Sequence, residues 1–176
     1  MDLRVLKTKQ SIRNAFMELR KKKPVEKITV RELSEIAMIN KATFYLHYSD
    51  IYELADEIEN SIIQEIFNEL TCLNSIFEQP SKLTREIVTA FYKRHEIISI
   101  LFSDIRSGKL VDKIEQEIKK RTLKSDSSVQ KQMMLTFVIQ GSFHTAIKYK
   151  NENAETVYST LSKFVETVVK SYLNSD

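Results

Sequence analysis

The sequence predicts an all-α fold, and three observations lead to that prediction. The 176 residues contain only two glycines and two prolines. Helix-forming leucine, isoleucine, lysine and glutamate are abundant, which favours long helices over a hairpin-rich β fold. Apolar residues also recur at spacings of three and four in several segments, which is the pattern of a buried helix face. The length suits a small domain of about 50 residues followed by a larger one.

The first predicted helix runs from Thr8 to Lys22 and ends before Pro24, because the residue before a proline is disfavoured in the α conformation. The basic run Arg20 to Lys23 suits the C-terminal end of a helix. We interpret this run as a solvated helix end, with nonspecific attraction of phosphate groups as the alternative. One helix face carries apolar residues at helical spacing, namely Ile12, Ala15, Phe16 and Leu19.

Two short helices joined by a tight turn are predicted at about residues 28–47. Thr29 and Glu32 have the spacing of a capping box, which opens a helix of two turns. Asn40 is the next N-cap and begins a helix over Lys41 to His47. This arrangement is a helix-turn-helix, whose second helix enters the major groove of DNA.

The rest of the chain predicts a helical bundle. Asp50 and Glu53 repeat the capping pattern and open a long acidic helix, with Leu54, Ile58, Ile62, Ile66 and Leu70 on one face. Later amphipathic segments are expected at about 82–93, 95–103, 109–123, 128–150 and 154–173.

Charge is distributed unevenly along the chain. Residues 1–50 contain 11 Lys and Arg against 6 Asp and Glu, whereas the remaining residues contain 16 against 18. Residues 51–80 contain seven acidic residues and no Lys or Arg. We therefore expect a DNA-binding domain at residues 1–50 and a helical effector-binding and dimerisation domain at residues 51–176.

Cysteine usage and the N-terminal charges favour a cytoplasmic protein. Cys72 is the single cysteine, so no intramolecular disulfide is expected, and the charged residues from Asp2 to Glu18 leave no apolar signal-peptide segment. All apolar stretches are shorter than the roughly 18 residues that span a bilayer. We expect no membrane segment.

Three segments share a pattern with a known family. Thr8 to Phe16 matches Thr-basic-x-x-Ile-x-x-Ala, Ile28 to Val30 matches Ile-Thr-Val, and Lys41 to Tyr48 matches Lys-Gly-Thr-Phe-Tyr-x-His-Phe. These segments resemble the N-terminal domain of the TetR/AcrR family of transcription regulators. The match covers about residues 7–55, and the later helices agree with the family only in number, length and helical character.

The resemblance implies which residues contact double-stranded DNA. Hydroxyl and cationic side chains near the start of the second predicted helix are implied to hold phosphate groups. In the third predicted helix, Tyr45 and His47 are implied to touch the DNA backbone, whereas Lys41, Thr43 and Leu46 are implied to lie near base edges. The implied set consists of Lys9, Thr29, Arg31, Asn40, Lys41, Ala42, Thr43, Tyr45, Leu46 and His47.

The sequence departs from the family pattern at three positions. Met38 takes the turn position usually occupied by glycine, which costs about 1 kcal/mol if the backbone needs a positive φ there. Ile51 replaces a lysine that contacts phosphate in the family. Ala42 replaces a glycine in the recognition helix and favours helix formation.

The two C-terminal segments carry broad apolar stripes. The resemblance implies that they form a four-helix bundle with a second copy, whereas packing within one chain is the other explanation of the helical glycine at position 141. The expected dimer residues are Val138, Gly141, Thr145, Val157, Leu161, Val165 and Val168. The resemblance also implies a pocket for a small-molecule effector, for which we select Phe91, Tyr92, Ile98, Leu101, Phe102, Phe137 and His144.

The resemblance implies a ligand-responsive repressor that binds a palindromic operator as a homodimer. The alternative is a family-like interaction protein or coactivator that acts through a protein partner, with weak or no autonomous DNA binding, as Met38 and Ile51 suggest. No phosphate-binding loop or hydrolase motif occurs, and His95 and His144 have no partners at zinc spacing. We expect no enzyme activity, no metal and no cofactor.

Overall fold

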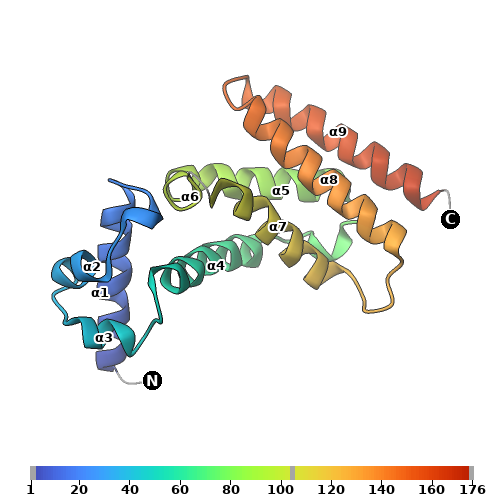
Figure 1. Ribbon diagram of the computed structural model, residues 1–176. Coiled ribbons are helices and arrows are strands. Elements are labelled where there is room, and N and C mark those ends of the chain that lie inside the picture. The colour runs from blue at the N-terminus through green and yellow to red at the C-terminus, as the bar shows by residue number, and fades with distance from the viewer. Residues whose placement is uncertain (1–2, 104–105, 175–176) are drawn as a thin grey trace. The chain divides into compact units, whose positions relative to one another are not determined.

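The computed structural model describes residues 3–103 and 106–174, and these residues form helices and connecting loops without a β-strand (Figure 1). The all-α prediction is confirmed. The short 3₁₀ helices of the described residues include η1 (Val25–Lys27) and η2 (Leu73–Ser75). The α-helices are α1 (Leu3–Arg20), α2 (Val30–Ile36), α3 (Lys41–Tyr45), α4 (Ile51–Glu69), α5 (Pro80–Lys93), α6 (His95–Leu101), α7 (Ser107–Thr122), α8 (Val129–Lys148) and α9 (Ala154–Leu173).

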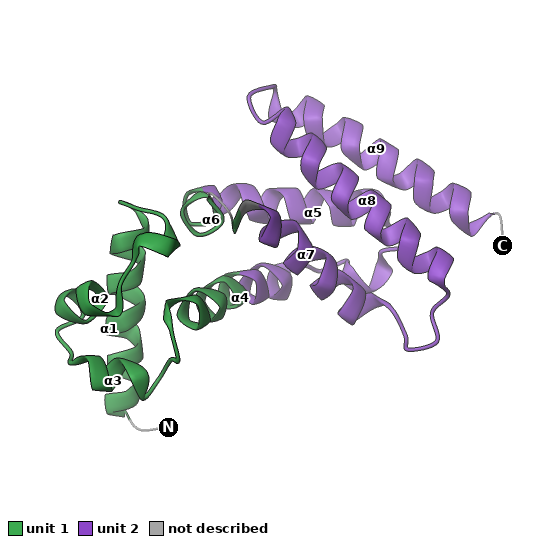
Figure 2. Ribbon diagram, viewed as in Figure 1, with its two compact units in different colours: residues 1–62, 96–106 green, residues 63–95, 107–176 purple. Residues whose placement is uncertain are grey.

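The chain folds into two compact units (Figure 2). Unit 1 consists of residues 1–62 and 96–106, and unit 2 consists of residues 63–95 and 107–176. Helix α4 begins in unit 1 and ends in unit 2. The functional division after residue 50 stays a prediction, because the units are defined by packing alone.

Unit 1 buries the apolar face of α1 that the spacing predicts, from Ile12 to Leu19. Helix α1 begins at Leu3, earlier than the predicted Thr8. Thr8 lies inside the helix, where its hydroxyl donates to the Arg4 carbonyl oxygen one turn back (2.9 Å). Helix α2 packs against α1 and α3. The Ser11 hydroxyl of α1 donates to the Ala37 carbonyl oxygen at the end of α2 (3.1 Å).

The end of α1 differs from the prediction of a solvated basic run. That prediction is right for Lys21 and Lys22, which are exposed, and wrong for Arg20, which is only 5% exposed. The Arg20 guanidinium donates to the carbonyl oxygen of Ile100 (2.6 Å) and to the hydroxyl of Ser103 (2.8 Å). Since Ile100 lies in the last turn of α6 and Ser103 follows it, Arg20 neutralises the C-terminal end of that helix instead of facing solvent.

A second buried arginine connects the segment after α6 to α4. The Arg106 guanidinium donates to Glu59 Oε2 (2.8 Å) and to Asp56 Oδ1 (2.6 Å), and both Arg106 and Glu59 are buried. Burial lowers the pKa of Arg106, but the hydrogen bonds and charge of the two carboxylates outweigh it and raise the pKa above its ordinary value. Two of the acidic residues between positions 51 and 80, Asp56 and Glu59, therefore form ion pairs inside unit 1.

Unit 2 is built from helix pairs. Helix α5 packs against α9, α7 packs against α8, and α8 lies side by side with α9 as an antiparallel pair (Figure 1). Ser128 and Asn153 cap α8 and α9 by accepting the N–H of the third residue of each helix, at 3.2 and 3.0 Å. The five predicted C-terminal segments agree with α5 to α9 within two residues at each end.

Candidate nucleic-acid interface

The helix-turn-helix begins with the predicted capping box. Thr29 Oγ1 accepts the N–H of Glu32 (3.2 Å), and Glu32 Oε2 accepts the N–H of Thr29 (3.4 Å). Lys23 Nζ lies 2.6 Å from Glu32 Oε1. The hydrogen bond with Lys23 outweighs desolvation and lowers the pKa of Glu32. The start of α2 is thus fixed both locally and by the basic end of the preceding helix.

The turn after α2 requires a left-handed residue, as the family glycine suggests. Met38 has φ 55°, the N–H of Met38 bonds to the Glu35 oxygen (3.3 Å), and the N–H of Ile39 bonds to the Ser34 oxygen (3.0 Å). This pair of hydrogen bonds is the Schellman motif, which usually has glycine at the Met38 position. The Met38 side chain is 93% exposed, so no packing compensates the strained backbone.

The predicted cap of the third helix is present. Asn40 Oδ1 accepts the N–H of Thr43 (2.7 Å) and the hydroxyl of Thr43 (2.8 Å). Helix α3 ends two residues before the predicted His47, because the His47 N–H bonds to the Phe44 oxygen three residues back (2.9 Å) and tightens the last turn. The recognition helix is therefore a short element whose first turn is fixed by a side chain.

The recognition helix has one buried and one exposed face. Phe44 is fully buried, which anchors α3 in unit 1. Leu46 is 81% exposed and Tyr45 is 57% exposed. The predicted DNA-contacting residues of this segment divide into exposed Asn40, Lys41, Ala42, Tyr45 and Leu46, and half-buried Thr43 and His47.

Lys9 has an internal partner, which its sequence position does not reveal. Its ammonium lies 2.8 Å from Glu57 Oε2 and 5.1 Å from the centre of the Tyr48 ring. The Tyr48 hydroxyl donates to the other Glu57 oxygen (2.8 Å). Burial raises the pKa of Glu57, but the hydrogen bonds from Lys9 and Tyr48 outweigh it, so the pKa lies below its usual value. These three residues join α1, the end of the helix-turn-helix and α4.

The helix-turn-helix itself carries no net charge. Residues 28–47 contain Arg31 and Lys41 against Glu32 and Glu35. Arg31 Nε donates to Glu35 Oε1 (2.9 Å), and both side chains are exposed. An exposed pair of this kind contributes little stability, so Arg31 is available to a phosphate. Exposed basic residues also occur elsewhere in unit 1, namely Lys7, Lys21 and Lys27.

The position of the family's phosphate-contacting lysine is part of the core. Ile51, the first residue of α4, is buried. The preceding Asp50 caps the helix, since Asp50 Oδ1 accepts the N–H of Glu53 (2.8 Å), as its spacing predicts. Ile51 therefore stabilises unit 1 by burial and offers no cation at the start of α4.

The expected effector-pocket residues lie in both compact units. Ile98, Leu101 and Phe102 belong to unit 1, where Leu101 and Phe102 are buried. In unit 2, Phe91 is half-buried, and the others are exposed, namely Tyr92, Phe137 and His144. The effector pocket stays a prediction.

The expected dimer residues differ in exposure. Val138 and Leu161 are buried inside unit 2, and Gly141 is exposed, while Thr145, Val157, Val165 and Val168 are half-buried. Apart from Gly141 itself, its two chain neighbours and the nearby backbone of α8, no atom of the described residues lies within 4 Å of the place that a Cβ would take at Gly141. Intrachain packing as the reason for this glycine is therefore wrong, and contact with a second copy stays a prediction.

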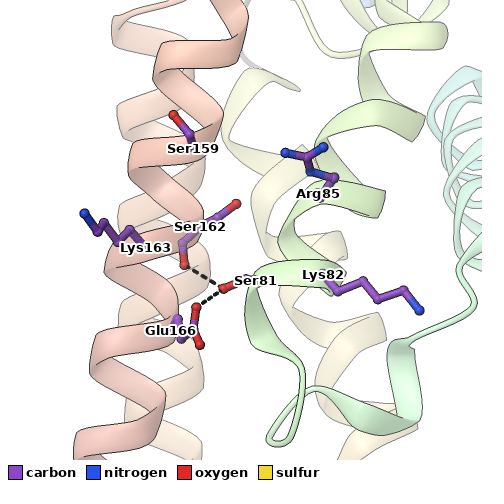
Figure 3. A pocket seen from close by; sticks show the side chains of 7 residues that line it. All are labelled: Ser81, Lys82, Arg85, Ser159, Ser162, Lys163 and Glu166. Atoms are coloured by element: carbon purple, nitrogen blue, oxygen red, sulfur yellow. Dashed lines mark hydrogen bonds between the residues drawn. The ribbon is translucent and has the colours of Figure 1, made fainter.

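A polar groove of about 450 Å³ lies in unit 2 between α5 and α9 (Figure 3). The Ser81 hydroxyl donates to the Glu166 carboxylate across this groove. Figure 3 shows Lys82 and Lys163 extending in opposite directions, so their charges do not converge on one ligand. The groove also contains none of the expected pocket residues.

Residues 3–103 and 106–174 contain no group of three or more His, Cys, Asp or Glu that could hold a metal ion. No helix in the described ranges is both long and apolar enough to cross a membrane.

Comparison with known proteins shows a partial similarity. The chain is 32% identical over 76 residues to YxbF of Bacillus subtilis (strain 168), which is named an uncharacterized HTH-type transcriptional regulator. The matched region is 43% of this chain and spans only 20% of the relative. No family model matches the chain, and no solved structure matches it. The chain is thus similar to a helix-turn-helix transcription regulator over part of its length.

Proposed function

We propose that this protein is a DNA-binding transcription regulator of the TetR/AcrR type. The observation that carries the proposal is the helix-turn-helix of unit 1, in which α3 buries Phe44 and exposes Lys41, Tyr45 and Leu46. A helix anchored on one face and exposed on the other has the form that enters a major groove. The partial similarity to a regulator named for this motif supports the same function.

The proposed contacts divide by chemistry. Arg31, Lys41 and the hydroxyl of Tyr45 are suited to phosphate oxygens or polar base edges, because they are exposed donors. Lys9 contributes in another way: its ammonium is shared with Glu57 and Tyr48, so it holds α1 against α4 and the end of the motif. We therefore assign Lys9 a positioning role.

We further propose that the protein binds a palindromic operator as a homodimer through α8 and α9. Val129, Met133 and Phe137 are exposed at successive turns of α8, with Gly141 one turn further, and Phe164 is exposed on α9. A stripe of exposed apolar side chains such as that on α8 favours burial against another protein surface. Two recognition helices about 34–36 Å apart would then contact successive major grooves.

Repression under control of a small-molecule effector is the output we propose. Its support is the resemblance of the helix-turn-helix to that of the TetR/AcrR family, together with the presence of a separate helical unit 2. In this scheme the effector alters the spacing of the two recognition helices and so lowers operator affinity.

The test is a fluorescence anisotropy titration of the full chain with duplexes from the region upstream of its own gene, at two salt concentrations. Tyr45→Ala is expected to weaken specific binding about tenfold, which is about 1.4 kcal/mol. Tyr149→Ala is the matched control, because Tyr149 is similarly exposed in unit 2 and belongs to none of the expected sites. Absence of specific binding by the intact protein, or equal effects of the two substitutions, would contradict the proposal.

A second candidate function is supported by the charge of the motif. Residues 28–47 are neutral overall, Ile51 is buried, and Met38 and Leu46 present apolar side chains to solvent. These features also suit a protein partner on the same surface, with weak or no autonomous DNA binding. The same titration separates the two functions, because a protein-binding role predicts no duplex that competes specifically.

A further inference from the structure

The exposed face of the recognition helix is mainly apolar. Leu46 is 81% exposed, and Ala42 is also exposed one turn earlier. A single exposed leucine is common on protein surfaces. Here, however, Leu46 lies on the face that the proposed function directs into the major groove, where every apolar side chain meets either a base or water.

The polar residues at the start of α3 are already engaged. Asn40 Oδ1 accepts two hydrogen bonds from Thr43, one from the N–H (2.7 Å) and one from the hydroxyl (2.8 Å). A bidentate contact of asparagine with adenine needs that oxygen as an acceptor of the adenine amino group. The cap therefore withdraws the Asn40 oxygen from base contacts and uses the only proton of the Thr43 hydroxyl.

The remaining side chains of α3 lack the groups that usually distinguish bases by hydrogen bonds. Helix α3 has the sequence Lys41-Ala42-Thr43-Phe44-Tyr45, so it contains no Arg, Gln, Asp or Glu. Helix α3 therefore cannot make the bidentate contacts of arginine with guanine or of glutamine with adenine. Lys41 remains as a flexible hydrogen-bond donor. The methyl groups of Ala42 and Thr43, with the isobutyl group of Leu46 after the helix, remain as apolar surface.

We propose that the chain selects its operator half-sites by the C5-methyl groups of thymines, which Leu46 contacts together with the methyl groups of Ala42 and Thr43. Thymine is the base whose major-groove edge carries a methyl group, and apolar side chains recognise it by burial. This inference rests on the proposed DNA-binding function. It adds to that function the class of operator sequence that is bound, namely half-sites with thymines within reach of α3.

The test begins with selection of duplexes from a random-sequence library by the full chain. Each thymine of an enriched half-site is then replaced by uracil, which removes the methyl group and keeps the base-pairing and O4 groups. Loss of one buried methyl contact is expected to weaken binding about fourfold. In Leu46→Ala the same replacement is expected to change affinity by less than about twofold, because the partner of the methyl group is gone.

Leu173→Ala is the matched control, since Leu173 is an exposed leucine in the last turn of α9, and it should retain the fourfold effect of uracil. A second measurement uses Leu46→Met, which keeps an apolar side chain and should keep the uracil effect. Enriched duplexes that bind equally well with uracil would overturn this inference alone. Failure to enrich any duplex would overturn the proposed DNA binding, and the inference with it.

Discussion

Substitution of Met38 by glycine is expected to stabilise the protein. The left-handed conformation costs an L-residue about 1–2 kcal/mol, and Met38 adopts it with φ 55°. Because the side chain is 93% exposed, its removal loses almost no packing. Glycine adds about 0.5–1 kcal/mol of unfolded-state entropy, so the net gain in the free energy of unfolding is about 0.5–1 kcal/mol.

Thermal unfolding followed by circular dichroism measures this effect. A gain of that size corresponds to a rise in Tm of about 1–4 °C for a chain of this length. The proteins are compared at equal concentrations, because the proposed dimerisation would shift Tm. Met38→Ala is the control, since alanine removes the side chain and keeps the cost of a positive φ. A Tm of Met38→Gly that is no higher than that of Met38→Ala would refute the strain argument.

Three further predictions concern internal contacts of unit 1. Arg20→Met should lower the free energy of unfolding by about 2–4 kcal/mol because it leaves buried carbonyl oxygens unpaired, whereas Lys22→Met should stay within about 0.5 kcal/mol; similar losses in urea unfolding would contradict the buried role of Arg20. Tyr48→Phe removes one hydrogen bond to a carboxylate and should cost about 1.5–3 kcal/mol in the same assay, and an unchanged midpoint would argue against the bond. Glu57→Gln should matter most at neutral pH: the lowered pKa of Glu57 gives stability above about pH 4.3 that is lost as pH falls through the folded pKa. The difference between wild type and Glu57→Gln should therefore shrink between pH 7 and pH 3, and a constant difference would contradict it.

Local sequence patterns predict most of the helices and caps. The Thr29 capping box, the Asn40 cap and the buried stripe of α1 depend on residues within one or two turns, and all three are present. The ends of α1 and α3 differ from the prediction. Thr8 lies inside α1 and bonds back to Arg4, and the last turn at His47 is tighter than an α-helix. The energy differences between alternative hydrogen-bond partners at a helix end are small. Residue spacing alone therefore does not predict the exact terminal residue.

The partners of the charged residues could not be predicted in this way. Arg20 bonds to Ile100, which is 80 positions away, and Lys9 pairs with Glu57 across 48 positions. The sequence shows that these residues are charged but not which of them the fold buries, so Arg20 resembled an ordinary basic helix end. The contacts with DNA, the second copy and an effector stay predictions for the same reason, because their partners lie outside the chain.

The segment 96–106 determines where unit 1 can be cut when a fragment or a chimeric protein is designed. It belongs to unit 1, although the residues on either side of it, 95 and 107, belong to unit 2. A fragment cut after residue 62 would keep Arg20 and Glu59 but lose the oxygens of Ile100 and the guanidinium of Arg106 that neutralise them. A chimera that transfers the helix-turn-helix of unit 1 to another protein therefore has to include α6 and Arg106 as a second, separate segment.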